Sequence, residues 1–174
     1  MRKAAAEADM SLGNLQYHFK DKTSLMAGLA EHYFGECSRM LDGYEHTPPT
    51  GSAEEQLHQL ILYLLGHVDH VEHISDMCRV FREMWALSAR DSEIHRQLMD
   101  YYRTTIEKLT ALLSPISSSQ DSAKHLASLL LPYIEGYSIT SEALPLEKKE
   151  TAKMLTKLCC GFLMKTKSDT KDPE

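Results

Sequence analysis

Apolar residues recur at helical spacing along nearly the whole chain. The clearest row runs through Leu57, Leu60, Ile61, Leu64, Leu65, Val68 and Val71. Steps of three and four positions place such residues on one side of an α-helix. Strand signals are scarce, because the chain has neither a sustained alternation of apolar and polar residues nor an Asn-Gly hairpin turn. The pattern predicts an all-α protein.

Capping residues and polar breaks divide the N-terminal part into short helices. Residues 1–8 are rich in helix-forming residues, and a second, very short helix is expected from Ser11 to about Phe19. Asp21 can cap a third helix. The segment 43–52, with two prolines and two glycines, is the clearest break in the chain.

Longer helices are expected beyond this break. The first follows Ser52-x-x-Glu55, which is the pattern of a capping box. Polar residues around Pro115 separate the middle helices from the last two, and Pro132 is expected to kink its helix. The expected ranges are 75–89, 91–113, 121–141 and 146–166.

The charge is unevenly distributed. The 174-residue chain carries a net charge of −6, whereas residues 1–40 hold five basic and five acidic residues. If this chain binds a polyanion, we therefore expect it to bind at the N-terminal end. The chain has no long uncharged apolar run and no signal peptide, so we expect a cytoplasmic protein that does not enter a membrane. Its four cysteines show neither disulfide nor zinc spacing, and we expect buried thiols.

The sequence does not support a metal site or a catalytic site. His67, His70 and His73 invite a metal assignment, but helical geometry turns the third imidazole about 120° away from the first. A di-iron bundle needs two Glu-x-x-His motifs, and only Glu55 and His58 form one. A nucleophile elbow, a phosphate-binding loop and a dinucleotide fingerprint do not occur. We predict no enzyme, cofactor or metal.

Two short helices joined by a turn are typical of a helix-turn-helix. The stretch "RKAAAEADMSLGNLQYHFKDKTSLMAGL" closely resembles the helix-turn-helix of the TetR family of transcriptional regulators. In that family an Ala-rich helix and a short turn precede the recognition helix. The matching residues are Ala5, Ala6, Ala8, Met10, Ser11, Gly13, Leu15, Tyr17, His18, Phe19, Lys22 and Leu25.

The recognition helix presents residue types suited to DNA. Ser11 can cap the helix, and Gly13 lets the backbone approach the groove closely. Leu12, Asn14 and Gln16 would project toward base edges, and amide side chains can pair bidentately with adenine.

Other residues of this stretch hold the helix or contact the DNA backbone. Leu15 and Phe19 are four positions apart and would turn inward. The resemblance implies that Tyr17, His18 and Lys22 contact sugar and phosphate. Tyr17 also fits a core position, and Lys22 also fits a solvated charge at a helix start.

The chain departs from the family pattern at three points. Gln16 stands where the family usually has a tyrosine, and Asp9 replaces the glycine that commonly ends the preceding helix. A first helix of the family's DNA-binding domain is also absent from this chain, which indicates either a fragment or an incomplete domain. The alternative function is therefore a helical ligand-binding or interaction protein that has lost DNA binding.

The resemblance implies three regions: a helix-turn-helix region over 1–40, a helical effector-binding and dimerisation domain over 41–166, and a polar tail over 167–174. The candidate pocket residues, which also fit a plain core, are His67, Met77, Phe81, Met84, Trp85, Tyr101 and Tyr102.

The family's last two helices form a four-helix bundle with a second subunit. The candidate interface residues, which also fit an intramolecular core, are Leu126, Leu130, Tyr133, Tyr137, Leu155, Leu158 and Phe162. These features predict a homodimeric repressor that releases its operator when a small molecule binds the helical core.

Overall fold

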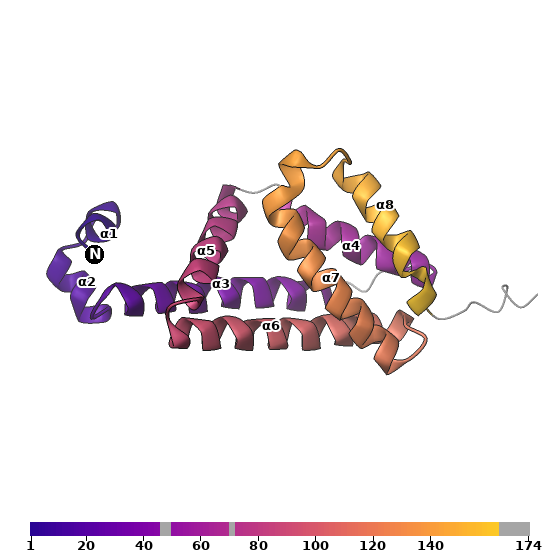
Figure 1. Cartoon of the computed structure of the whole chain (residues 1–174), viewed down its shortest axis with the longest axis horizontal. Helices are drawn as coiled ribbons and strands as arrows, with labels where there is room; N and C mark the ends of the chain where they lie inside the picture. Colours follow the sequence, from indigo (N-terminus) through magenta and orange to yellow (C-terminus); the bar gives the residue numbers. More distant parts are fainter. Residues whose placement is uncertain (46–49, 70–71, 164–174) are drawn as a thin grey trace, which may run out of the picture.

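The computed structural model describes residues 1–45, 50–69 and 72–163, and within them the side chains of 45, 67–69 and 72–79 are left out. These ranges are helical and contain no strand, apart from one isolated bridge between Ser117 and Leu163. The helices, shown in Figure 1, are α1 (Arg2–Glu7), α2 (Leu12–His18), α3 (Lys22–Glu45), α4 (Ala53–Asp69), α5 (Glu72–Ser88), α6 (Ser92–Leu113), α7 (Gln120–Thr140) and α8 (Lys148–Cys159).

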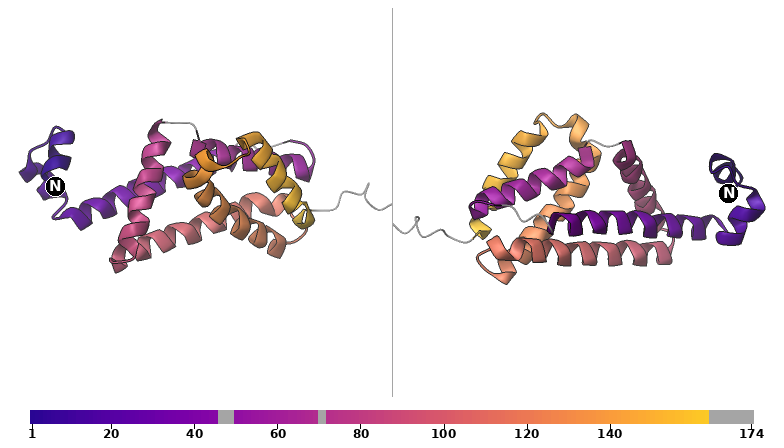
Figure 2. Two further views of the ribbon diagram at one scale, coloured as in Figure 1. Left: turned by 45° about the horizontal axis from the view of Figure 1, so that its top comes forward. Right: turned by 180° about the vertical axis from the view of Figure 1, so that it is seen from behind.

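The helices are arranged along one long axis. α3 and α6 lie side by side, and α5 packs across both of them. α1 and α2 lie beyond one end of this pair, while α4, α7 and α8 pack together at the other end (Figure 2). α3 continues through the expected region boundary at residue 40, so one helix links the N-terminal pair to the larger body.

The predicted capping residues define three helix starts. The Asp21 carboxylate accepts the backbone N–H of Ser24 at 2.8 Å, which also lowers the pKa of Asp21. Glu55 and Ser52 bond each other's backbone N–H groups, as a capping box requires. Asp91 accepts two N–H groups at the start of α6. These local bonds fix the starts of α3, α4 and α6.

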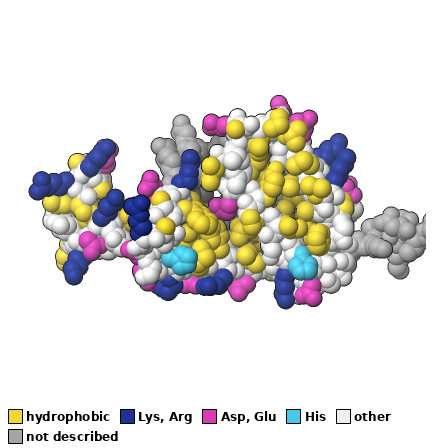
Figure 3. All heavy atoms as spheres, viewed as in Figure 1, with side chains coloured by type: hydrophobic (Ala, Val, Ile, Leu, Met, Phe, Trp, Pro, Cys, Tyr) yellow, Lys and Arg dark blue, Asp and Glu magenta, His cyan; other side chains and the backbone are white. Residues whose placement is uncertain are grey.

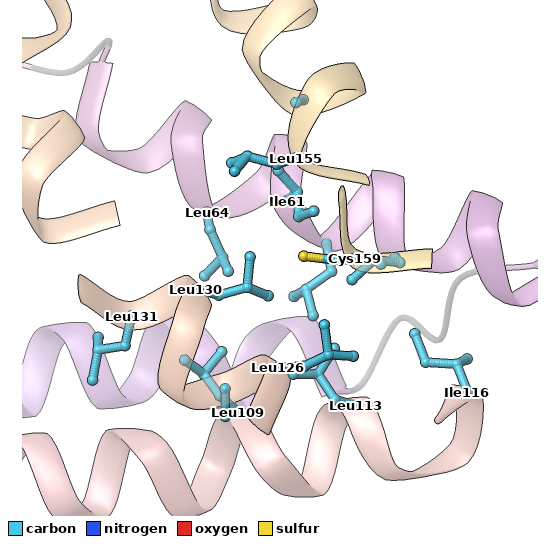
Figure 4. Close-up of a cluster of buried hydrophobic side chains, with 14 of the residues drawn as sticks. Ile61, Leu64, Leu109, Leu113, Ile116, Leu126, Leu130, Leu131, Leu155 and Cys159 are labelled. Carbon is cyan, nitrogen blue, oxygen red and sulfur yellow. The ribbon is translucent and has the colours of Figure 1, made fainter. Parts of the chain in front are cut away.

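The main core lies among α4, α6, α7 and α8. Figure 4 shows part of it, including Ile61 and Leu64 of α4, Leu109 and Leu113 of α6, and Leu130 of α7. Burial of large aliphatic side chains of this kind is worth roughly 1.5–3 kcal/mol each. The stability of the fold therefore resides mainly in this end of the molecule.

The end expected for the last helix is wrong. α5 begins at Glu72, close to the expected start at about residue 75. α8 ends at Cys159 and passes into a 3₁₀ turn over Cys160–Phe162, although the apolar spacing predicted a helix to residue 166. The main chain of Ser118 donates to the Phe162 carbonyl at 2.9 Å, which ties this turn to the loop after α6.

Pro132 lies inside α7 without ending it. The helix is continuous from Gln120 to Thr140, and Pro132 is exposed. An exposed position lets water solvate the carbonyl that Pro132 leaves without its helical donor.

Candidate DNA-binding and ligand sites

The turn between α1 and α2 is closed by main-chain hydrogen bonds. The N–H of Met10 donates to the Ala5 carbonyl at 2.9 Å, and that of Asp9 donates to the Ala6 carbonyl at 3.2 Å. This pattern needs a left-handed residue after the helix, and Asp9 has a φ of 52°. The backbone thus explains why glycine is usual at this position.

A small number of apolar contacts hold the recognition helix α2. Ser11 caps it by accepting the Asn14 N–H at 3.1 Å. Leu15 of α2 and Ala5 of α1 are buried, and the two helices contact each other. The predicted cap and the predicted inward position of Leu15 are both confirmed.

Phe19 joins the recognition helix to α3. A Cβ atom built on Gly28 would lie 2.7 Å from the Phe19 ring, so the ring rests directly on the bare backbone of Gly28. Any larger side chain there would push the ring away. Sequence reasoning assigned Phe19 an inward position but did not identify Gly28 as its partner.

Most of the predicted DNA-contacting side chains are exposed on or beside α2. Successive helical residues turn by about 100°, so Gly13 and Tyr17 lie opposite the buried Leu15. Tyr17 is 86% exposed and is therefore not a core aromatic. The remaining candidates Ser11, Asn14, Gln16, His18 and Lys22 are exposed, and Leu12 is partly buried.

Basic side chains surround this end of the molecule. Arg2, Lys3, Lys20 and Lys22 are exposed, and Figure 3 shows Lys and Arg side chains spread around the α1–α2 end. Asp9 is exposed at the same end. The end therefore offers cations for phosphate contacts together with an acid that opposes them.

The structure separates the candidate pocket residues. Met84 is fully buried with Ala30 and Ile94, in a cluster that serves packing. Trp85 is 51% exposed, and its Nε1 donates to the Tyr102 hydroxyl at 2.9 Å. The side chains of His67, Met77 and the other histidines of the 67–73 stretch lie outside the described residues. Within the described part, no group of three or more potential metal ligands gathers.

A cavity of about 210 Å³ lies between α5 and α7. Its lining residues are Phe81, Arg82, Trp85, Glu135, Gly136, Ser138 and Ile139. It brings together two of the candidates, Phe81 and Trp85, and Tyr102 joins them through Trp85. Tyr101 instead lines a separate groove of about 460 Å³ between α3 and α6.

Glu135 is the cavity residue that sequence reasoning missed. It is partly buried and hydrogen-bonds Tyr102. Burial raises its pKa from 4.5 to about 7. The sequence does mark Glu135 as unusual, because no other Asp, Glu, Lys or Arg occurs between Lys124 and Glu142.

An aromatic cluster connects this cavity to α3. We use this name for the rings of Phe34, Phe81, Trp85, Tyr101 and Tyr102. Phe34 of α3 stacks on Tyr101 of α6, with centroids 4.4 Å apart, and Phe81 of α5 packs against both at 5.3 Å. The cluster continues through Tyr102 to Trp85.

A polar contact joins α3 and α6 beyond the aromatic cluster. Lys108 of α6 pairs with Asp42 and donates to the Ser38 hydroxyl at 2.6 Å. The side chain of Lys108 is partly buried and that of Asp42 is half-exposed, so the pair is only partly shielded from water. α3 is thus held by α6 along much of its length.

Four of the candidate interface residues lie in the chain's own core. Leu126, Leu130, Tyr137 and Leu155 are buried among α4, α6, α7 and α8 (Figure 4). They leave almost no surface for a partner, so their assignment to an interface is corrected. Both faces of α7 are apolar, and spacing alone did not reveal which one faces inward. Of the others, Tyr133 and Phe162 are partly buried and Leu158 is exposed.

The outward faces of α7 and α8 carry exposed apolar side chains. Leu129 and Ile139 of α7 are 54% and 57% exposed, and Leu158 of α8 is 69% exposed. Met154 lies one helical turn before Leu158 and is also exposed. Figure 3 shows apolar atoms gathered over these two helices.

Comparison with known proteins defines the class. A scan against protein-family models matches none. An uncharacterized HTH-type transcriptional regulator in dhlA 5'region of Xanthobacter autotrophicus is 41% identical over 145 residues, which are 83% of this chain and 70% of the relative. The probable HTH-type transcriptional regulator YttP of Bacillus subtilis (strain 168) is 28% identical over 59% of this chain and 46% of its own length.

Two solved structures have the same fold. A transcriptional regulator from Rhodococcus sp. Rha1 matches with a TM-score of 0.73 at 19% identity, over 92% of this chain and 84% of its own. A second Rhodococcus sp. structure, assigned to the TetR-family transcriptional regulators, matches with a TM-score of 0.66 at 18% identity, over 92% and 86%.

The all-α body with a helix-turn-helix at one end is therefore the fold of these solved transcriptional regulators. The chain belongs to the HTH-type transcriptional regulators, as its 41% identical relative shows, and not to an enzyme class. None of the helices in the described ranges is both long and apolar enough to cross a membrane.

Proposed function

We propose that this protein is a homodimeric, cytoplasmic repressor that binds operator DNA through α2 and releases it when a small molecule enters the cavity between α5 and α7. The observation that carries the proposal is the aromatic cluster. It joins the cavity wall at Phe81 and Trp85 to Phe34 of α3. α3 begins only four residues after the recognition helix ends at His18.

The DNA contact follows from the open side of α2. Asn14 and Gln16 present amide groups that can read base edges, and Tyr17 stands opposite the buried Leu15. Lys22 lies at the first turn of α3, where an ammonium group adds a contact to phosphate. Residues 1–40, which we propose as the DNA-binding region, therefore combine base readout with backbone contact.

The exposed apolar faces of α7 and α8 support a homodimer. Leu129, Met154 and Leu158 would be covered when the same faces of two subunits pack together. The faces lie at the end of the molecule that is distant from α2 (Figure 1). A two-fold dimer would present two recognition helices to a pseudo-palindromic site.

Coupling between the two sites follows from packing. A ligand between α5 and α7 moves Phe81 or Trp85, and the stacked rings pass that displacement to α3. A shift of α3 changes the separation of two recognition helices in a dimer. Operator affinity then falls, because both half-sites can no longer be contacted together.

DNA binding is tested by titrating the protein against the DNA upstream of its own reading frame at several salt concentrations. We expect sequence-specific binding that weakens as salt rises. Lys22→Ala should weaken all DNA roughly equally, whereas Gln16→Ala should change base preference by about 1–3 kcal/mol at one position. The reverse pattern would show that their roles are exchanged. A lack of specific binding at low salt favours the alternative, a helical ligand-binding protein without DNA binding.

The dimer is tested by sedimentation of Leu158→Asp, which places a charge on the exposed face of α8. We expect dissociation to monomers and a loss of operator affinity, because one recognition helix alone contacts only half of the site. Leu144→Asp is the matched control, since Leu144 is also exposed but lies in the connection between α7 and α8. A Leu158→Asp protein that remains dimeric contradicts this interface.

A further inference from the structure

A hydrogen-bond chain orients the carboxylate of Glu135 at the cavity. The indole N–H of Trp85 donates to the Tyr102 oxygen at 2.9 Å. Because an indole N–H can only donate, the Tyr102 hydroxyl keeps its own proton for the carboxylate of Glu135, to which it is hydrogen-bonded. One residue from each of α5, α6 and α7 thus takes part, and Tyr102, the hydrogen-bond partner of the Glu135 carboxyl, is neutral.

Among the side chains that the structure describes, the groups that shift the pKa of Glu135 include no positive charge. Tyr101 and Tyr102 on α6 stay neutral, since burial raises the pKa of both hydroxyls, and Cys37 on α3 lies beside Tyr101. Arg82 on α5 is exposed at the rim of the cavity. A guanidinium in close contact would lower the pKa of a carboxyl, whereas burial raises that of Glu135 to about 7.

The walls of the cavity complement a positive group. Phe81 and Trp85 present aromatic rings, and Ile139 presents an aliphatic surface. A cation gains from the negative face of an aromatic ring, most of all from tryptophan. It also supplies the charge partner that a desolvated carboxylate needs. An anionic ligand would be repelled by Glu135, and a neutral one would leave the carboxylate uncompensated.

We propose that this cavity is a binding site for a small organic cation, with its ammonium group between Glu135 and the ring of Trp85 and its apolar part against Phe81 and Ile139. This proposal rests on the proposed function, because it takes the cation to be the effector of the repressor. It adds the chemical class of the ligand and assigns Glu135 as the residue that selects for charge.

The chain provides its own reporter, since Trp85 is its only tryptophan. Dissociation constants are measured by Trp85 emission and by calorimetry for choline, whose charge does not titrate, and for its uncharged analogue 3,3-dimethylbutan-1-ol. We expect choline to bind roughly tenfold tighter or more than the alcohol. Glu135→Gln should abolish the difference. Glu142→Gln, which removes the same charge from an exposed position outside the cavity, should preserve it.

The pH dependence gives a readout that needs no variant. Loss of the Glu135 proton exposes the negative charge, so choline affinity should rise roughly tenfold or more between about pH 5.5 and about pH 8.5. If Glu135→Gln fails to fold, as judged by its helical circular dichroism, this pH dependence and the choline-to-alcohol ratio of the wild type decide the matter.

Several results would contradict the cation site. The first two are equal affinities for choline and the alcohol, and no saturable choline binding. The others are a choline-to-alcohol affinity ratio that Glu135→Gln leaves unchanged, and benzoate binding that Arg82→Gln abolishes.

Operator binding, followed by fluorescence anisotropy of labelled DNA, separates this inference from the proposed function. Choline that binds as expected without releasing DNA refutes the proposed release mechanism and leaves the site intact. Release by uncharged or anionic compounds alone refutes the site and leaves the repressor intact.

Discussion

The two ends of the molecule differ in how much apolar surface they bury. In the α1–α2 end, the buried side chains are Ala5 and Leu15, and Phe19 adds a contact to Gly28. At the opposite end, α4, α6, α7 and α8 share a large cluster of buried aliphatic residues. The proposed recognition helix is therefore held by few contacts, while the proposed ligand and dimer faces rest on a stable body.

This difference suits a regulator that must reposition its recognition helices. α1 and α2 have six and seven residues, and isolated helices of that length are unstable in water. Their order depends on α3, to which Phe19 anchors them through Gly28. Elements that move in switching are generally drawn from the less stable part of a structure.

The largest expected effect is a loss of stability that a core substitution causes at one end of the molecule but not at the other. Leu113→Ala removes a fully buried side chain from the main core and should lower the free energy of unfolding by about 2–5 kcal/mol. Leu15→Ala should leave the main thermal transition nearly in place, because the core does not depend on α2, yet it should abolish operator binding. Calorimetry and DNA anisotropy measure the two quantities.

Hydrogen exchange provides the control for this pair of variants. In Leu15→Ala the amides of α1 and α2 should lose protection, whereas those of α6 and α7 keep it. If Leu15→Ala lowers the main transition as much as Leu113→Ala does, the two ends fold as one unit and the contrast between them is wrong.

The next expected effect is a pH dependence of stability caused by Glu135, which lies in the larger, well-packed end of the molecule. Because the folded-state pKa of Glu135 is raised to about 7, the folded protein holds its proton more tightly than the unfolded chain does. This contribution to stability is complete below about pH 4.5 and is lost as pH rises through about 7. Relative to Glu135→Gln, the wild type should lose on the order of 1–3 kcal/mol of unfolding free energy across this window.

Urea denaturation at a series of pH values measures this effect. Glu142→Gln serves as the control, because Glu142 is exposed and should leave the pH profile unchanged. Parallel profiles for the wild type and Glu135→Gln would show that Glu135 is not desolvated in the folded protein.

A substitution at Gly28 tests the anchor between the two ends. Gly28→Ala places a methyl group 2.7 Å from the Phe19 ring, so the ring must shift. We expect a loss of roughly 1–3 kcal/mol in operator affinity with little change in the main thermal transition. Gly35→Ala is the matched control, since a Cβ there meets nothing within 4 Å. Equal DNA affinities for the two variants would show that Phe19 does not orient α2.

The smallest effect lies at the turn before α2. Asp9→Gly relieves the positive φ and removes an acid near the DNA, and we expect protection of the α1–α2 amides to rise by about 0.5–1 kcal/mol. Asp9→Asn removes the charge while keeping the side-chain shape. If DNA affinity increases in both variants, the cause is the loss of the Asp9 charge. If it increases only in Asp9→Gly, the cause is the relief of the positive φ in the backbone.

Local signals made much of the fold predictable. Ser11, Asp21, Ser52 and Asp91 act as caps through bonds to residues two or three positions away, so their pattern is visible in the sequence. The inward position of Leu15 follows from the same short-range geometry. The exposure of the recognition residues also agrees with the helix-turn-helix motif.

Long-range packing was less predictable. Both faces of α7 are apolar, so spacing did not tell that Leu126 faces the core while Leu129 faces outward. The cavity at Glu135 is built by helices distant in sequence, and Gly28 contacts Phe19 only because the turn between α2 and α3 brings the Phe19 ring onto α3. Such partners depend on the tertiary arrangement, which a single sequence does not state.

The central claim is that α2 reads operator DNA, and footprinting of the DNA upstream of the reading frame tests it most directly. We predict two protected half-sites whose centres are separated by one turn of the DNA helix or a multiple of it. The Gln16→Ala protein should protect sites of a different base sequence, and the Leu15→Ala protein should protect none. Wild-type protein that protects no site at low salt, or that protects the same site after both substitutions, would contradict the claim.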